Sequence, residues 1–227
     1  MIDIDQLAKR FEKILSKTGD ATLVAVTKYS DLREIGVAYD IGHRDFGENR
    51  VSDLETKAQA FKSESRTDVR WHFIGHLQSN KVAKLLKVPG LHAIHSIDSE
   101  KLLKEVLKRE SDLHSPLSLF IQVNTSGEKE KGGFEDYQSL KKAVETCLRS
   151  PSSVVMLEGL MTMGTYRTDD REAEAKRCFQ LLKNYAERLK SDLKIPSLKL
   201  SMGMSDDYQI ALAEGSDLIR VGSLLFK

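Results

Sequence analysis

Several features that mark other classes of protein are scarce in this sequence of 227 residues. Only two cysteines occur, Cys147 and Cys178, and they lack CxxC spacing, which argues against a disulfide framework and favours a reducing cytoplasm. No apolar run approaches the roughly 18 residues that a membrane span requires, and the acidic start lacks the basic and apolar regions of a signal peptide. The net charge of +1 selects neither nucleic acid nor an anionic membrane as a partner. We therefore expect a cytoplasmic monomer without such partners.

The sequence instead contains a regular alternation of two patterns. Eight short apolar stretches typical of buried strands alternate with stretches whose apolar residues have helical spacing. A further helix is expected at residues 3–17, ahead of the first strand. The expected strands are 22–27, 43–46, 70–74, 91–95, 117–123, 154–158, 198–202 and 217–221, and the helices between them are 31–41, 48–62, 78–87, 99–110, 134–149, 170–190 and 206–214.

This alternation predicts parallel strands joined by helical crossovers. Eight such units in about 200–250 residues match an α/β fold of the (β/α)8 TIM-barrel type, here as a single domain over residues 1–227. No helix is expected after the last strand, so helix 3–17 would cover the seam between the last and first strands. The rival is an open doubly wound sheet, against which stands the lack of a GxGxxG motif after any strand.

Lys28 ends the first expected strand, directly after the apolar run 23–27. An amine held at the edge of a core is partly desolvated, and burial favours its neutral form. A neutral lysine amine is a nucleophile that forms a Schiff base with an aldehyde or ketone. The alternative is an ordinary lysine that leaves the strand for solvent. In a barrel the carboxyl ends of all strands meet at one mouth, so Lys28 would share it with the polar stretches Gly47–Asn49, Gly75–His76, Asn124–Ser126, Ser201–Ser205 and Arg220–Ser223.

The loops after the seventh and eighth strands carry a candidate phosphate site, at the place where barrels often bind phosphate. Ser205 stands where helix 206–214 is expected to begin, so its hydroxyl and the following N–H groups suit an anion. Gly222 allows the backbone to approach closely, and Ser223 adds a hydroxyl. The two aspartates after Ser205 would repel a phosphate unless they point away. Otherwise Ser205 caps its helix and Gly222 makes a turn.

A reactive lysine and a phosphate site in one mouth suggest pyridoxal phosphate (PLP) as cofactor. PLP needs an amine for its aldehyde, donors for its phosphate and a partner for its pyridine nitrogen. Arg220 is a candidate for the last role, and such a permanent donor would keep the ring nitrogen unprotonated and weaken the ring as an electron sink. Two alternatives stay open for Arg220, namely a salt bridge inside the barrel, for instance with Glu158, and a contact with the phosphate.

These residues lie in stretches that resemble the pyridoxal phosphate homeostasis proteins. That family looks like the barrel domain of fold-type III PLP enzymes such as alanine racemase, without their second domain. The match runs through nearly the whole chain in the order of the family. The matching stretches are Ala25–Lys28, Phe46–Asn49, Trp71–Lys81, Val123–Ser126, Gly159–Met161, Leu200–Asp206 and Arg220–Gly222.

The resemblance implies a site that binds PLP without a catalytic residue. Lys28 would carry the cofactor as a Schiff base, with Asn49 near this bond. Phosphate contacts, a partner for the cofactor ring and two wall residues complete the implied set. The set is Lys28, Asn49, His76, Met204, Ser205, Arg220, Gly222 and Ser223, in which Ser205, Gly222 and Ser223 contact phosphate, Arg220 faces the cofactor, and His76 and Met204 are wall residues. Thr27 departs from the serine of many relatives, which should leave binding intact.

The resemblance further implies a protein that holds PLP and delivers it, with apo forms of PLP enzymes as recipients. The alternative is a PLP-dependent enzyme acting on an amino acid, such as a racemase or a decarboxylase. A racemase needs a second acid–base group opposite the lysine, which in alanine racemase comes from a second domain of the partner subunit. This sequence stops at Lys227, which leaves His76 or Tyr29 for that task, and we expect no catalytic activity. A cofactor-free aldolase using Lys28 is a more remote alternative.

Three other features do not change this interpretation. His72 and His76 are four residues apart, but they straddle a strand end and a loop rather than one helix face, so no metal is expected. His92 and His95 lie on one strand, where alternation should send them to opposite faces. The segment 127–133 has charged residues between glycines and is typical of a mobile, solvated loop rather than a lid.

Overall fold

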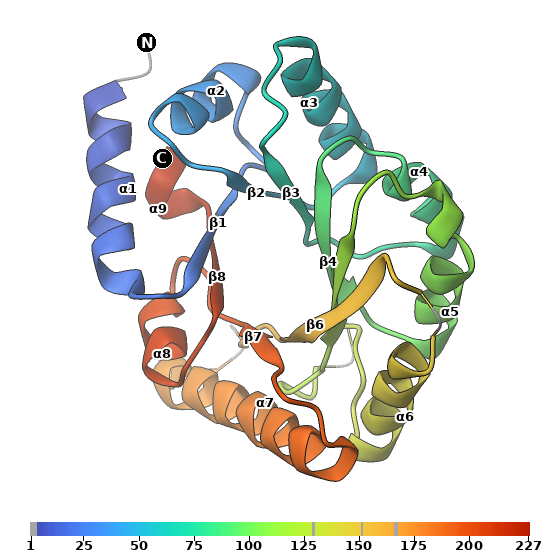
Figure 1. Cartoon of the computed structure of the whole chain (residues 1–227). Coiled ribbons are helices and arrows are strands. Elements are labelled where there is room, and N and C mark those ends of the chain that lie inside the picture. The colour runs from blue at the N-terminus through green and yellow to red at the C-terminus, as the bar shows by residue number, and fades with distance from the viewer. Residues whose placement is uncertain (1–3, 129, 151, 166–167) are drawn as a thin grey trace.

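Eight parallel strands close into a barrel in which each strand pairs with the next in chain order and β8 pairs with β1 (Figure 1). This computed structural model describes residues 4–128, 130–150, 152–165 and 168–227, so position 3 of the first expected helix and position 129 of the segment 127–133 lie outside the described residues. The strands are β1 (Thr22–Val26), β2 (Asp45–Glu48), β3 (Arg70–Phe73), β4 (Leu91–Ile97), β5 (Leu117–Gln122), β6 (Val155–Met161), β7 (Lys199–Ser201) and β8 (Leu218–Val221).

Helices surround the barrel and follow the strands in turn (Figure 1). They are α1 (Ile4–Thr18), α2 (Leu32–Asp40), α3 (Val51–Ser63), α4 (Val82–Leu86), α5 (Glu100–Lys108), α6 (Tyr137–Leu148), α7 (Arg171–Leu193), α8 (Tyr208–Ala213) and α9 (Ser223–Phe226), with 3-10 turns at Ser79–Lys81 and Glu110–Asp112. The (β/α)8 barrel with an extra N-terminal helix is therefore confirmed. Among the described helices, none is both long and apolar enough to cross a membrane.

Side-chain caps decide where several helices begin. The Asp31 side chain accepts a hydrogen bond from the Glu34 N–H, and the Glu34 side chain accepts one from the Asp31 N–H. This capping box starts α2. Ser99 caps α5 by accepting from the Leu102 N–H. Asp136 caps α6, so this helix begins three residues later than the apolar pattern predicts.

The core forms two layers. A large cluster fills the space between the strands and the helices, while a smaller one lies inside the barrel and comprises Val24, Ala93, Phe120, Met161 and Leu218. Both cysteines are free and buried.

A shift in register breaks the alternation of β4. Trp71 on β3 pairs with Leu91, whereas the next residue, His72, pairs with Ala93. The rings of His92 and His95 both lie against the His72 ring, at 5.3 and 5.2 Å between centroids. The expected separation of these two histidines onto opposite faces is therefore wrong.

The expected absence of a helix after the last strand is also wrong. The short helix α9 follows β8, and α1 packs on it at the seam of the barrel. The Arg10 guanidinium donates to the Leu225 carbonyl at 3.2 Å, and the rings of Phe11 and Phe226 meet edge to face at 6.0 Å. Four residues are too few to show helical periodicity, which is why the sequence pattern missed this element.

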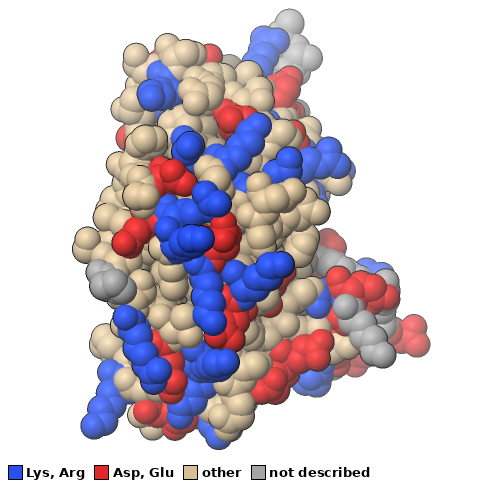
Figure 2. Space-filling model, turned by 90° about the vertical axis from the view of Figure 1, so that its right-hand side faces the viewer, with Lys and Arg blue, Asp and Glu red and all other residues tan. Residues whose placement is uncertain are grey.

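The outer face over α4, α5 and α6 carries both signs of charge side by side (Figure 2). Glu100 pairs with Lys104 within α5 and with Lys142 of α6, and Arg109 pairs with Glu105. Such exposed pairs contribute little to stability, on the order of 0–1 kcal/mol each. The mixture of signs leaves this face without a block of one charge.

Candidate functional site

A pocket of about 470 Å³ opens at the carboxyl ends of the strands. All eight residues predicted to bind a cofactor line it, although they come from the ends of five different strands and the loops that follow. They are Lys28, Asn49, His76, Met204, Ser205, Arg220, Gly222 and Ser223. The barrel therefore brings together residues that are up to 195 positions apart in the chain, from 28 to 223.

Lys28 lies two residues after the end of β1 and is exposed, so its surroundings are less apolar than we expected. Its Nζ atom lies 5.0 Å from the centroid of the Tyr29 ring, and Nζ of Lys227 lies 5.5 Å from the same centroid. Two amines thus flank one aromatic ring at the pocket. The position of Lys28 at the end of a buried strand, rather than its burial, distinguishes it.

The backbone that carries Lys28 is fixed from below by a buried charged cluster. Glu48 is fully buried, and its Oε1 atom accepts from the Thr27 hydroxyl at 2.6 Å and from the Lys57 amine at 2.6 Å. The same Lys57 amine donates to the Thr27 carbonyl at 2.8 Å. Helix α3 thereby holds the ends of β1 and β2 together, one residue before Lys28.

The wall formed by the ends of β2 and β3 depends on Gly75. A Cβ atom at this position would lie 2.0 Å from the Asn49 carbonyl oxygen, so only glycine allows the two loops to meet. Beside it, Nδ1 of His76 lies 3.1 Å from the Asp98 carboxylate while the rest of the side chain is exposed. The predicted place of His76 at the mouth matches the structure, whereas His72 is buried.

The loop that carries Ser205, part of the candidate phosphate site, differs in structure from the prediction. Helix α8 begins at Tyr208, and the Asp207 carboxylate accepts from the Met204 N–H at 2.6 Å, so Ser205 does not stand at a helix start. Burial raises the pKa of Asp207, against the effect of that hydrogen bond and of the Arg220 charge. Asp207 thus turns inward, whereas Asp206 is exposed and lines the pocket.

The helix that begins at the pocket is α9. The Ser205 hydroxyl accepts from the Gly222 N–H at 3.3 Å, and Gly222 precedes the first turn of α9. A Cβ atom on Gly222 would lie 3.0 Å from the Val26 carbonyl oxygen, so glycine permits the close approach of β8 to β1. The first N–H groups of a helix suit an anion, and Ser223 adds its hydroxyl there.

Arg220 lies on β8, is 4% exposed and reaches across the barrel interior. It donates from Nη1 to the Ser201 hydroxyl at 2.6 Å and from Nη2 to the Thr162 carbonyl at 2.9 Å. Glu158 instead pairs with Lys199 at 2.6 Å, so the alternative of a salt bridge between Arg220 and Glu158 is wrong. Arg220 is anchored by neutral acceptors and borders the pocket.

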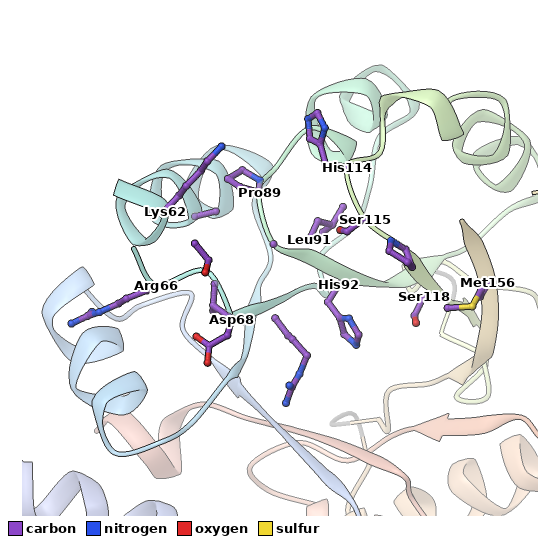
Figure 3. Close-up of a pocket in the computed structure, with 16 residues that line it drawn as sticks. Lys62, Arg66, Asp68, Pro89, Leu91, His92, His114, Ser115, Ser118 and Met156 are labelled. Atoms are coloured by element: carbon purple, nitrogen blue, oxygen red, sulfur yellow. The ribbon is translucent and has the colours of Figure 1, made fainter. Parts of the chain in front are cut away.

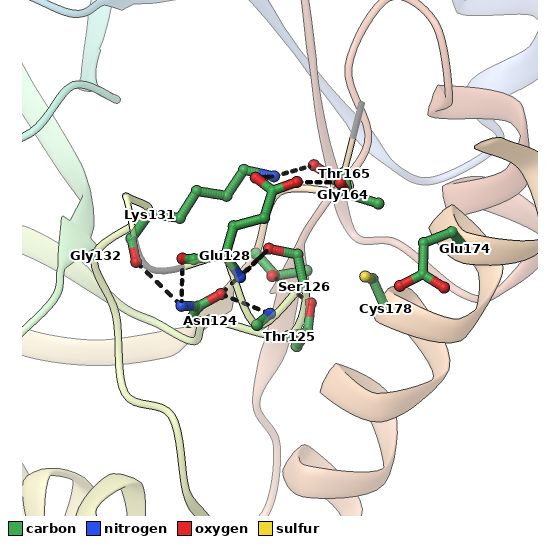
Figure 4. A network of polar contacts seen from close by, with 12 residues as sticks. Asn124, Thr125, Ser126, Glu128, Lys131, Gly132, Gly164, Thr165, Glu174 and Cys178 are labelled. Carbon is green, nitrogen blue, oxygen red and sulfur yellow. Dashed lines mark hydrogen bonds and ion pairs between the residues drawn. The ribbon is translucent and has the colours of Figure 1, made fainter. Parts of the chain in front are cut away.

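The segment 127–133 is tied to the loops around it (Figure 4). The Asn124 amide donates to the carbonyls of Glu128 and Lys131, at 3.0 and 3.1 Å. The Lys131 amine pairs with Glu128 at 2.8 Å and donates to the Gly164 carbonyl at 2.6 Å, while Thr165 bonds to Glu128. These contacts hold Glu128 and Lys131 against neighbouring loops, while Gly127, Glu130 and Gly132 are exposed to solvent.

Another cavity, of about 710 Å³, lies at the opposite end of the barrel (Figure 3). It is lined by the amino ends of β3 to β6, among them Arg70, His92 and Ser118. None of the eight predicted residues lies there. In the described part of the chain, no group of three or more His, Cys, Asp or Glu residues is arranged to hold a metal ion.

The sequence interpretation missed several residues of the pocket. Met163 follows β6, and Phe226 and Lys227 belong to the end of the chain around α9. Met163 could have been assigned from its place after a predicted strand. Phe226 and Lys227 had no such signal because α9 was not expected.

Comparisons with known proteins agree with this geometry. The family described as "Alanine racemase, N-terminal domain" matches residues 2–227. A pyridoxal phosphate homeostasis protein from Schizosaccharomyces pombe is 40% identical over 205 residues, which cover 90% of this chain and 82% of that protein. A second relative of that name, from Helicobacter pylori, is 36% identical over 231 residues, which cover 99% of this chain and 96% of that protein.

A solved structure shares the fold over its whole length. PipY of Synechococcus elongatus with PLP bound has a TM-score of 0.86 and 31% sequence identity, and the match covers 98% of this chain and 100% of that one. The match with the family and the identities with its members lead to one assignment. This chain belongs to the family of alanine racemase N-terminal domains and, within it, to the pyridoxal phosphate homeostasis proteins.

Proposed function

We propose that this protein binds PLP covalently through the Lys28 amine and takes part in PLP homeostasis or delivery. The observation that carries the proposal is that the eight residues predicted to bind the cofactor line one pocket. The names of the relatives and the PLP-bound structure of PipY support it.

The residues of the pocket fit the parts of the cofactor. Lys28 offers an amine for the aldehyde, Ser205 and Ser223 offer hydroxyl donors for the phosphate, and Gly222 lets the backbone approach it closely. Arg220 is anchored at the pocket and offers a permanent positive charge. PLP would supply an electron-accepting ring, and an arginine beside its ring nitrogen would keep that nitrogen unprotonated and make the ring a weaker electron sink. These residues therefore favour holding the cofactor over using it.

We further propose that residues 1–227 act as one PLP-binding domain, as a cytoplasmic monomer, and that apo forms of PLP enzymes receive the cofactor. Two buried free cysteines fit a reducing compartment.

The test is an absorbance titration of the purified protein with PLP, followed by borohydride reduction and peptide mapping. Lys28→Ala should abolish the visible absorbance of covalently bound PLP. Lys227→Ala is the matched control because Lys227 lines the same pocket and contacts the same Tyr29 ring. It should keep the absorbance. A pyridoxyl group on a lysine other than Lys28 would contradict the proposed site.

A second candidate function is that of a PLP enzyme acting on an amino acid. It is favoured by the presence of Tyr29 and His76, two side chains capable of acid–base chemistry, in the pocket that holds Lys28. We propose that neither acts catalytically. Incubation of the PLP-loaded protein with L-amino acids, with chiral analysis and carbon dioxide detection, separates the two functions. Turnover that Lys28→Ala, Tyr29→Phe or His76→Gln removes would establish the enzyme instead.

A further inference from the structure

A line of buried polar side chains crosses the interior of the barrel and ends at Arg220. Asp45 Oδ1 lies 3.0 Å from Nε2 of His72, and Nδ1 of His72 lies 3.0 Å from Nε2 of His95. Nδ1 of His95 lies 2.8 Å from the Ser201 hydroxyl, which also accepts from Arg220. His72 is 2% exposed, and His95 and Ser201 are fully buried. The line joins β2, β3, β4, β7 and β8.

The residues at the two ends fix the direction of hydrogen-bond donation along this line, from Arg220 as donor to Asp45 as acceptor. Arginine only donates hydrogen bonds and a carboxylate only accepts them, whereas a neutral histidine donates from one nitrogen and accepts at the other. Burial lowers the pKa of His95 well below its ordinary value, so this ring is neutral. The arrangement with two neutral rings runs from Arg220 to Ser201, then through His95 and His72 to Asp45. Each histidine then carries its proton on Nε2.

The opposite direction would leave polar groups unmatched. If Nδ1 of His95 donated to Ser201, the serine would accept two hydrogen bonds and its own proton would need another acceptor. His72 would then have to donate from both nitrogens and would become a buried cation. Asp45 already has a cationic partner, because Arg70 binds both of its carboxylate oxygens. A further buried charge is costly to desolvate.

Two neighbouring contacts fix the line in place. The His95 ring stacks on Phe120, with 4.4 Å between centroids and 15° between planes. At the far end, burial alone would raise the pKa of Asp45, but hydrogen bonds from Arg70 and His72 outweigh it and hold that pKa well below its usual range. Asp45 therefore remains an acceptor at neutral pH, and the direction of the line is maintained.

We propose that His72, His95 and Ser201 are positioning residues that fix the Arg220 guanidinium for the bound cofactor. Arg220 precedes Gly222 by two residues and lies within β8, below the loops assigned to the phosphate. Its place suits the ring of PLP rather than the phosphate. When the serine proton is directed at His95, the lone pairs of the Ser201 hydroxyl stay available to Nη1 of Arg220 and the serine proton has its acceptor. This inference rests on the proposed function, because the consequence for the cofactor requires PLP to bind in this pocket.

The first test uses the apo protein and so does not depend on PLP. Long-range ¹H–¹⁵N NMR spectra of the histidine rings report which nitrogen carries the proton. We expect the Nε2–H form at both His72 and His95 at pH 7. An Nδ1–H form of His95, or a doubly protonated His72, would overturn the direction of the line even if PLP binds normally.

The second test compares two buried serines, Ser201 at the end of β7 and Ser216 just before β8. Ser201→Ala breaks the line, whereas Ser216→Ala removes a buried hydroxyl that bonds only to backbone carbonyls in the described part of the chain, those of Leu200, Met202 and Leu218. Both should lower the urea midpoint. Only Ser201→Ala should weaken PLP binding, by about tenfold, as expected for a lost hydrogen bond to a charged group.

Two further variants complete the comparison. His95→Gln should weaken PLP binding like Ser201→Ala, and Ser201→Thr, which keeps the hydroxyl, should restore affinity to within about threefold. Equal losses of affinity in Ser201→Ala and Ser216→Ala would show a merely structural role and overturn the proposal. Failure of the unmodified protein to bind PLP would refute the proposed function instead, and the apo NMR result would still decide the direction of the line.

Discussion

Removal of the Lys57 ammonium should destabilise the protein strongly, although Lys57 lies outside the pocket. Lys57→Met keeps most of the aliphatic side chain but leaves the buried Glu48 carboxylate with the Thr27 hydroxyl as its remaining partner among those described. Breaking a buried ion pair from one side costs about 3–5 kcal/mol, because the remaining charge stays desolvated. For a chain of this size, each kcal/mol lowers the melting temperature by roughly 2–4 °C, so a loss of roughly 6–20 °C is expected.

Urea unfolding followed by circular dichroism measures this effect. Lys62→Met is the matched control, because Lys62 lies on the same helix α3 but is exposed, and it should change the free energy of unfolding by less than about 0.5 kcal/mol. The double variant Glu48→Leu with Lys57→Met removes both charges and should recover most of the loss. A loss below about 1 kcal/mol in Lys57→Met would refute the argument that this pair fixes the ends of β1 and β2.

Three further predictions follow from single contacts. Gly222→Ala places a Cβ atom 3.0 Å from the Val26 carbonyl oxygen, so it should lower the urea midpoint and raise the PLP dissociation constant about tenfold; unchanged affinity would contradict the assigned phosphate site. Gly159→Ala would set a Cβ atom 1.9 Å from the Lys199 carbonyl oxygen, and should cost about 3–5 kcal/mol by forcing β6 from β7, which urea unfolding can detect. Burial lowers the pKa of His43 to about 4, below its unfolded value near 6.5, so the unfolded state takes up the proton first and stability falls as pH drops from about 6.5 to about 4, by up to about 3 kcal/mol. His43→Phe, which fits between Phe11 and Phe46, should flatten that part of the pH profile of unfolding, and an unchanged slope would refute this contribution.

The barrel was predictable because its pattern is long and regular. Eight strands with helices between them leave few topologies, and the polar residues at the strand ends then fall at one mouth. The ends of elements were less predictable, because caps rather than apolar spacing set them. Asp136 is an example, because as the cap of α6 it makes the helix begin at Tyr137, three residues beyond the expected start at 134.

The positions of the site residues were predictable from the sequence pattern, whereas their hydrogen-bond partners were not. Lys28, Ser205 and Arg220 were found from their places at or just after the ends of predicted strands, and the structure brings them to one pocket. Their partners were not predictable, because the contacts of Arg220 with Ser201 and of Lys57 with Glu48 join residues whose relative position only the closed barrel fixes. The register shift in β4, which brings His92 and His95 against His72, likewise has no signal in a single sequence.

The pocket joins the end of the first strand to the last residues of the chain. Lys28 follows β1, whereas Arg220, Gly222 and the residues of α9 come from positions 220–227, and α1 braces α9 through Arg10. During synthesis the cofactor amine would therefore emerge long before the groups that complete its pocket. PLP could then bind only after the last strand has docked. Bound PLP would in turn stabilise the closed barrel at the seam between β8 and β1 and slow its reopening.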